Sequence, residues 1–156
     1  MKRFFNLSKL FLLLALLQAW ACAVSITITG QGSADGTWDV TTAIGTFNTL
    51  QSQLETQEWW GNSSLAGIFA GQVGSLLGSP NNVYGDNYGP FFAYAYDGGV
   101  DLAYFFYGKA VDAPTGWNPT DSWTWATATR VPDTGSTAAL LGAGVVALAF
   151  ARRRLG

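Results

Sequence analysis

The sequence predicts an α+β fold: a small, mostly antiparallel β-sheet of about five strands with one or two inserted helices. Apolar and polar residues alternate over residues 24–29, 37–42 and 122–129, which is the period of a half-buried strand. Residues 46–58 and 62–78 instead space their apolar side chains as helices do. Both ends of the chain carry short apolar runs beside basic residues, so we set these ends apart from the folded domain.

The N-terminus has the layout of a secretory signal peptide, which we place at residues 1–23. A basic start precedes a short apolar run, and Ala21 and Ala23 supply the small-x-small pattern that signal peptidase accepts. The apolar run is too short for the roughly 20 residues of a spanning helix. We therefore expect export through the translocon and cleavage by signal peptidase after Ala23, with Val24 as the first residue of the exported domain.

Residues 24–130 form this β-rich extracytoplasmic domain, and their composition excludes several classes of function. They contain nine acidic and two basic residues, a formal charge of −7, and such a surface repels nucleic acid. They contain no histidine, and the chain's only cysteine is Cys22 in the signal peptide. Catalytic triads built on histidine and ordinary zinc sites are therefore excluded. We predict no enzyme, no cofactor and no metal site.

Two hairpins and two loops organise the strands. Residues 24–29 and 37–42 predict a first hairpin. Residues 91–107 predict a long hairpin around an Asp-Gly-Gly turn, and both faces of its strands are apolar or aromatic, as in strands covered on two sides. Residues 81–90 and 108–121 are rich in Gly, Asn, Asp and Pro, which predicts loops.

The first predicted helix covers roughly residues 46–58, and the second begins at Asn62 or Ser63 and stops at Gly78. The second helix presents an apolar stripe that ends at Leu76. Its opposite face carries four glycines, Gly67, Gly71, Gly74 and Gly78. Either another segment approaches this face closely, or the face is turned to solvent.

The exported domain contains six tryptophans, and we expect most of them to lie in the core. Exposed indole rings stack on sugar rings, whereas buried ones supply the large apolar area that a small domain without disulfides needs. Trp59 and Trp60 precede Gly61 and Asn62, and Trp117 lies between Gly116 and Asn118, so we expect these three to be the most exposed. They are the candidate stacking residues for a glycan or exopolysaccharide.

Two groups of acidic residues are weaker candidates. Glu55 and Glu58 fall on one face of the first predicted helix, and paired carboxylates serve glycoside hydrolysis. A solvated helix face explains the same pair. The second group consists of turns rich in Asn and Asp, whose side-chain oxygens are suitable ligands for calcium. The preference of Asn and Asp for turns explains their presence equally well. Their residues are Asn81, Asn82, Asp86, Asn87, Asp97 and Asp101.

The C-terminal residues 131–156 form a three-part tail. An apolar run predicts a transmembrane helix over about 137–151, and the basic residues after it hold the C-terminus in the cytoplasm. A short Pro/Gly motif precedes the helix, and a basic segment, 152–156, follows it. The motif is Val131, Pro132, Asp133, Thr134 and Gly135, and the basic cluster is Arg152, Arg153 and Arg154.

This tail resembles the PEP-CTERM class of bacterial sorting signals, in the variant whose motif reads VPDSG, with Thr134 in place of serine. The resemblance implies that an exosortase, an integral membrane enzyme, recognises the motif and processes the tail. It also implies transient anchoring by the transmembrane sorting helix, followed by delivery to the cell surface or extracellular matrix. The WWGN, GSPNN and GPFFAY segments are similar to uncharacterised PEP-CTERM ectodomains, to which no activity is attached.

Two alternatives compete for the tail. The motif is also similar to the LPxTG motif of sortase substrates, with Val131 in place of leucine, which would make the chain a sortase-anchored cell-wall protein. Such substrates usually carry a long spacer before the motif, whereas here a Trp-rich strand ends a few residues before it. A plain anchor helix would leave Pro132 and Gly135 without a role. We therefore expect an exosortase substrate.

Overall fold

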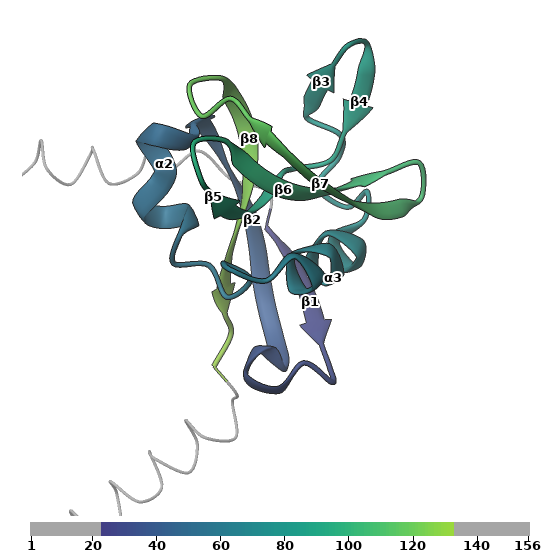
Figure 1. Cartoon of the computed structure of the whole chain (residues 1–156). Coiled ribbons are helices and arrows are strands. Elements are labelled where there is room, and N and C mark those ends of the chain that lie inside the picture. The colour runs from purple at the N-terminus through teal and green to yellow at the C-terminus, as the bar shows by residue number, and fades with distance from the viewer. Residues whose placement is uncertain (1–22, 133–156) are drawn as a thin grey trace, which may run out of the picture.

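The computed structural model describes residues 23–132, and these form two small antiparallel sheets, a protruding hairpin and two helices (Figure 1). This agrees with the predicted α+β class. The described residues contain eight strands rather than about five. The signal peptide before Ala23 and the tail beyond Pro132 lie outside the described residues.

The first sheet has the strand order β1-β2-β8, and all its pairs are antiparallel. Its alternating sequence places Ile26, Trp38 and Val40 in the core and leaves the intervening residues towards solvent. This confirms the predicted first hairpin and last strand. The bounds are Val24–Ile28 for β1, Gly36–Thr46 for β2 and Ser122–Arg130 for β8, and a 3-10 helix, η1 (Gly32–Ala34), lies between β1 and β2.

The second sheet has the order β5-β6-β7, with β5 at Phe92–Tyr96, β6 at Val100–Phe106 and β7 at Lys109–Trp117. The predicted hairpin around the Asp-Gly-Gly turn is confirmed as β5 and β6. The predicted loop 108–121 is wrong for most of its length, because β7 occupies it. β7 lies at the edge of the sheet, where the missing N–H of Pro114 removes no bond to a neighbouring strand.

The predicted loop 81–90 is also wrong, because it forms a hairpin of two short strands, β3 (Asn81–Val83) and β4 (Asp86–Tyr88). The side chain of Asn81 is buried at the base of this hairpin. Its Nδ2 donates to the carbonyl oxygens of Gly89 and Thr124, at 3.0 Å each, and its Oδ1 accepts from the N–H of Thr124 at 2.8 Å. The amide therefore takes the place of a neighbouring strand beside β8 and fixes the hairpin to it.

The two sheets meet at β8 through a short parallel bridge between Phe91 and Trp125. The N–H of Phe91 donates to the carbonyl of Thr124 at 3.0 Å, and the N–H of Ala126 donates to the carbonyl of Phe91 at 2.9 Å. Phe91 and Phe92 are adjacent in an extended segment, so their side chains point to opposite faces and enter different cores.

Two apolar cores flank β5 and β6, which confirms that these strands are covered on both faces. The first lies between α3 and the sheet β1-β2-β8, and the second lies beneath α2 and the β3–β4 hairpin. The largest fully buried side chains come from both cores: Trp59, Phe69, Phe92 and Ile28 from the first, and Trp125, Phe47, Phe91, Leu54 and Leu102 from the second.

Both predicted helices form, and both are shorter than expected. α2 covers Phe47–Leu54, and its N-cap Thr46 accepts a bond from the N–H of Thr49 at 3.2 Å. α3 covers Ser63–Val73, and Asn62 caps it by accepting a bond from the N–H of Leu65 at 3.0 Å.

α3 ends at Val73 because Gly74 turns the chain with a φ of +53°, so the helix does not continue to Gly78. Leu76 therefore leaves the apolar stripe and is 62 % exposed. The glycine face is mixed: a Cβ on Gly67 would meet no atom within 4 Å, whereas one on Gly71 would touch Ala110 at an ordinary 3.7 Å. No helix within residues 23–132 is long and apolar enough to cross a membrane.

Candidate ligand-binding cleft and sorting tail

Two tryptophans meet where β7 leads into β8. Trp117 ends β7 and Trp123 lies near the start of β8, and their rings contact edge to face with centroids 5.6 Å apart. Both rings also contact the buried ring of Phe91, at 5.2 and 5.5 Å. The core therefore fixes the position of both indoles, although each remains half-buried.

The indole nitrogens of this pair are unusual. Nε1 of Trp117 and Nε1 of Trp123 are shielded from solvent and have no hydrogen-bond partner among the described residues. A shielded donor without a partner costs about 1–3 kcal/mol. The other buried indoles do not carry this cost, because Trp38, Trp59 and Trp125 donate to the carbonyls of Ala34, Ala93 and Gly45, respectively.

The pair lines a cleft of about 480 Å³, which we call the tryptophan cleft. This volume lies within the range of small-molecule sites. The cleft is bounded by β3 on one side and by the segment from β7 to β8 on the other. Its residues are Asn82, Val83, Tyr84, Thr115, Trp117, Asn118, Asp121 and Trp123.

The polar residues of the cleft are held by an ordered turn between β7 and β8. The Oδ1 atom of Asn118 accepts bonds from the N–H and hydroxyl of Thr120, at 3.0 and 2.8 Å. Its Nδ2 atom donates to the carboxylate of Asp121 at 3.2 Å. These bonds place a carboxylate and an amide beside two indole rings, which is the mixture of apolar platform and oriented polar groups typical of ligand sites.

Tyr84 closes the cleft from the tip of the β3–β4 hairpin. Its side chain is fully exposed, and its backbone has a φ of +52°. Gly85 follows with a φ of +91°, so the turn has the two positive φ values that normally select Asn-Gly or Gly-Gly. A tyrosine in this conformation costs roughly 1–2 kcal/mol, which packing within the domain does not repay.

A separate polar pair lies on the sheet away from this cleft. The hydroxyl of Tyr94 donates to Asp112 Oδ1 at 2.6 Å. Burial, and then this bond to Asp112, raise the pKa of the Tyr94 phenol far above its usual range. Burial also raises the pKa of Tyr104, with a smaller contribution from Tyr88. Both phenols therefore stay neutral and support the fold.

The three predicted stacking residues have different positions. Trp59 is fully buried in the first core, so the expectation that it is exposed is wrong. Trp60 is half-buried and stacks on Phe47 with centroids 6.1 Å apart, outside the cleft. Trp117 is in the cleft. The sequence pattern did not predict Trp123 as a site residue, because its place in the alternation of β8 is that of a core residue. It did not predict Tyr84 either, although a Tyr-Gly pair between two short strands indicates an exposed turn.

The acidic candidates do not assemble into a site. α2 ends at Leu54, so Glu55 and Glu58 do not share a helix face. Glu55 accepts a bond from Gln51, and Glu58 accepts one from Ser33. Within residues 23–132 no three acidic or other metal-ligating side chains gather to hold an ion. The oxygen-rich turn is a structural feature: Asn82 donates to Asn87 within the β3–β4 hairpin, and Asn81 is its buried base.

The folded domain ends directly at the Pro/Gly motif. The N–H of Val131 donates to the carbonyl of Thr37 at 2.9 Å, so β8 pairs with β2 up to this residue. Arg130 donates to the carbonyls of Ser33 and Asp35, and its guanidinium lies 5.6 Å from the centre of the Trp38 ring. At the other end of the domain, Val24 is the first residue of β1.

Of the motif itself, Val131 is half-buried and Pro132 is exposed. Residues 130–155 match the family model of the VPDSG-CTERM motif. The chain carries a VPDSG-CTERM tail. This confirms the recognised class of C-terminal sorting signal, which implies export and association with the surface or membrane. The remaining motif residues, Asp133, Thr134 and Gly135, lie outside the described residues, as does the basic cluster.

The folded domain in front of the VPDSG-CTERM tail has no counterpart in the other comparisons. No curated protein and no solved structure matches the chain. The activity of residues 24–130 therefore has to be argued from the geometry of the domain itself.

Proposed function

We propose that this chain is an exported surface protein whose domain binds a polysaccharide in the tryptophan cleft, and whose VPDSG-CTERM tail is processed by an exosortase. The observation that carries the binding proposal is the pair of half-buried indole rings of Trp117 and Trp123, which line a cleft beside Asp121. The role is one of binding rather than catalysis.

A sugar ring presents an apolar face and hydroxyl groups that complement the side chains of the tryptophan cleft. The apolar face of a pyranose stacks on an indole, and its hydroxyls both accept bonds from N–H donors and donate them to carboxylates. In the tryptophan cleft the rings of Trp117 and Trp123 supply the stacking surface, and the carboxylate of Asp121, held by Asn118, is an acceptor.

The location supports a polysaccharide as the partner. A domain exported beyond the membrane meets the polymers of the cell envelope and extracellular matrix. Nucleic acid is disfavoured by the formal charge of −7 on residues 24–130. The tryptophans also suit this ligand, because a rigid aromatic ring loses little side-chain entropy when a ligand covers it.

The binding test is NMR on the indole N–H groups of the full chain, purified in a zwitterionic detergent that contains no sugar. Titration with envelope polysaccharide should shift the signals of Trp117 and Trp123. The signals of Trp38, Trp59 and Trp125 serve as internal controls, because their N–H groups already donate to backbone carbonyls.

A matched pair of variants separates binding from general damage. Trp117→Phe should weaken binding about tenfold, in keeping with the loss of one central aromatic contact. Trp60→Phe changes a half-buried indole outside the cleft and should leave affinity unchanged. If no polysaccharide shifts either cleft indole, the binding proposal fails.

The sorting proposal has its own test. We expect the intact mass of the protein isolated from its host to be lower than that of residues 24–156, and deletion of the host's exosortase to restore the mass of residues 24–156. Retention of the tail in a host that makes an exosortase would contradict the proposal. Loss of processing on deletion of a sortase instead would favour the alternative, a sortase-anchored cell-wall protein, for which the absence of a spacer after Arg130 is unfavourable.

A further inference from the structure

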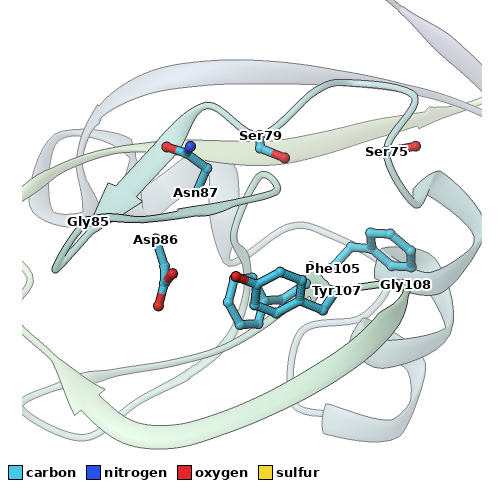
Figure 2. A pocket seen from close by; sticks show the side chains of 9 residues that line it. Ser75, Ser79, Gly85, Asp86, Asn87, Phe105, Tyr107 and Gly108 are labelled. Atoms are coloured by element: carbon cyan, nitrogen blue, oxygen red, sulfur yellow. The ribbon is translucent and has the colours of Figure 1, made fainter.

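A second cleft shares the β3–β4 hairpin with the first. Its volume is about 410 Å³, and it lies between β4, the turn from β6 to β7, and the segment that follows α3. Figure 2 shows Asp86, Asn87, Ser79 and Tyr107 around it. We call it the tyrosine cleft. Since β3 bounds the tryptophan cleft and β4 bounds the tyrosine cleft, the hairpin is a common wall between the two.

The tyrosine cleft shares an exposed tyrosine, an aspartate and an asparagine with the tryptophan cleft. Tyr107 is 83 % exposed and has a φ of +46°, and Gly108 follows with a φ of +83°. This is the same Tyr-Gly turn that displays Tyr84 at the first cleft. In both two-residue turns the hairpin geometry requires the positive φ values, and the choice of tyrosine places an exposed ring at the edge of a cleft. The polar groups around it are a carboxylate, an amide and two serine hydroxyls.

The wall between the clefts is held firmly to the domain. Tyr88 of β4 stacks on Phe106 of β6 with centroids 4.4 Å apart, and contacts Tyr104 edge to face at 4.9 Å. The buried amide of Asn81 fixes the base of the hairpin to β8. The spacing between the two clefts is therefore set by packing, as a ligand that occupies both would require.

The charge of the two clefts restricts the ligand. Asp121 lies in the tryptophan cleft and Asp86 in the tyrosine cleft, and none of the described residues that line either cleft is basic. The surrounding domain has a formal charge of −7. A polymer of uronic or sulfated sugars would meet carboxylates at both places, whereas an amino sugar would find an anionic partner and aromatic faces suited to a cation.

We infer that a single polysaccharide chain lies across the Tyr84–Gly85 turn with sugar units in both clefts, and that this chain is neutral or carries amines. The inference rests on the proposed function, since it assigns a ligand class and a second subsite to the same binding surface. Two linked contacts on one polymer raise its affinity above that of either contact alone. The domain would accordingly bind the interior of long chains in preference to short fragments.

The experiment compares probes of defined length and charge on the full chain in sugar-free detergent. The probes are a glucose disaccharide, a glucose octasaccharide, a glucosamine octasaccharide and a galacturonic acid octasaccharide. We expect the glucose octasaccharide to bind at least about tenfold more tightly than the disaccharide. The glucosamine probe should bind at least as tightly as the glucose octasaccharide, with an affinity that falls as salt is added. The galacturonic acid probe should bind most weakly.

Variants locate the second subsite. Tyr107→Ala, in the tyrosine cleft, should reduce the affinity for the glucose octasaccharide to within about twofold of the disaccharide value, because only one linked contact then remains. Ile44→Ala is the control, because Ile44 is 78 % exposed but lies outside the residues that line either cleft. It should leave the affinity for every probe unchanged.

The outcomes distinguish this inference from the function on which it rests. Equal affinity for the disaccharide and the glucose octasaccharide, with no effect of Tyr107→Ala, overturns the two-cleft inference and leaves binding in the tryptophan cleft intact. Preferred binding of the galacturonic acid probe overturns the charge assignment. The absence of any response of the Trp117 and Trp123 signals to all four probes overturns the proposed function as well.

Discussion

Tyr84 and Tyr107 are the residues at which the sequence departs furthest from what their turns favour. Each takes a left-handed backbone conformation that suits asparagine or glycine, and each leaves its ring in solvent. The free energy that such a residue costs is not recovered by burial. Both rings border a cleft, which links the strained choice to binding.

This link predicts opposite effects of one substitution on stability and on binding. Tyr84→Asn should raise the free energy of unfolding by about 1 kcal/mol, because asparagine tolerates the left-handed region. It should also weaken polysaccharide binding about tenfold, as expected for loss of a central aromatic contact. Urea denaturation and indole titration measure the two effects.

The control for Tyr84→Asn is Tyr96→Asn, which should lower stability. Tyr96 lies in the regular strand β5, and its ring contacts Phe47 at 4.9 Å. If Tyr84→Asn lowered stability as well, the ring of Tyr84 would have a structural role, and strain would not explain its presence.

Tyr94 predicts how stability depends on pH. The pKa of its phenol is raised in the folded state by burial and by Asp112, from a value of about 10 in the unfolded chain. The unfolded chain therefore loses this proton first, so stability should be constant up to about pH 10 and fall above it. Urea midpoints between about pH 8 and 11.5 should show this fall. In Tyr94→Phe the fall should be shallower but not absent, because the pKa of Tyr104 is also raised; an unchanged slope would contradict the assignment.

At the level of single residues, the sequence shows which residues are neighbours along the chain but not which side chains meet in the fold. Trp59 and Trp117 both lie near glycine and asparagine in the sequence, yet one is fully buried and the other lines a cleft. The difference arises from contacts that are distant in sequence, because Trp59 donates to the carbonyl of Ala93 and Trp117 packs on Phe91. Asn81 was assigned to a loop for the same reason, since its buried role depends on Thr124, 43 positions away.

At the level of elements, periodicity predicted the long strands and both helices, and it failed where short strands carry turn-forming residues. β3, β4 and β7 contain Asn, Asp, Gly and Pro, which local propensity assigns to loops. Their pairing comes from neighbouring strands: β7 pairs along β6, and the β3–β4 hairpin is tied to β8 by Asn81. The tryptophan cleft is built largely from these elements, which is why the sequence did not predict that β3 and the end of β7 lie side by side there.

The glycine face of α3 gives a prediction at this scale. A Cβ at Gly67 would meet no atom within 4 Å, so Gly67→Ala should raise stability by up to about 1 kcal/mol through helix propensity. Gly74→Ala should lower stability, because Gly74 ends the helix with a φ of +53°. Thermal unfolding of the two variants checks the pair. A destabilising Gly67→Ala would show that another segment or partner approaches this face.

The C-terminal end of β8 gives a second prediction about stability at this scale. Arg130 bonds to two carbonyls of the turn between β1 and β2 and lies over Trp38, so it holds the last residues of the domain in place. Arg130→Ala should lower stability by about 1–2 kcal/mol and speed hydrogen exchange at the N–H of Val131. Arg130→Lys should recover only part of this, because lysine lacks the planar fork. Lys109→Ala, at the other basic residue of the domain, should change stability by less than about 0.5 kcal/mol; equal effects of the two alanine variants would contradict the role of Arg130.

At the level of the whole molecule, β8 separates the candidate binding site from the tail. Trp123 lines the tryptophan cleft near the start of β8, and Arg130 ends the strand beside the motif. At about 3.3 Å per residue, the two positions are about 23 Å apart. Figure 1 shows the β3–β4 hairpin and the end of β8 at opposite ends of the domain. Since no spacer follows Arg130, a tail held in the membrane would place η1 next to the bilayer and turn both clefts away from it.

This orientation can be measured before any processing occurs. The predicted exported form, residues 24–156, has no cysteine, so a single introduced cysteine carries one fluorophore without competing sites. In vesicles that contain a headgroup acceptor dye, a label on Ser33→Cys, in η1, should transfer energy much more efficiently than a label on Tyr84→Cys, at the hairpin tip. The reason is that the two sites lie near opposite ends of β8. Equal transfer from both sites would show that the domain lies flat on the membrane or tumbles freely, and the clefts would then not be presented outward to polysaccharide.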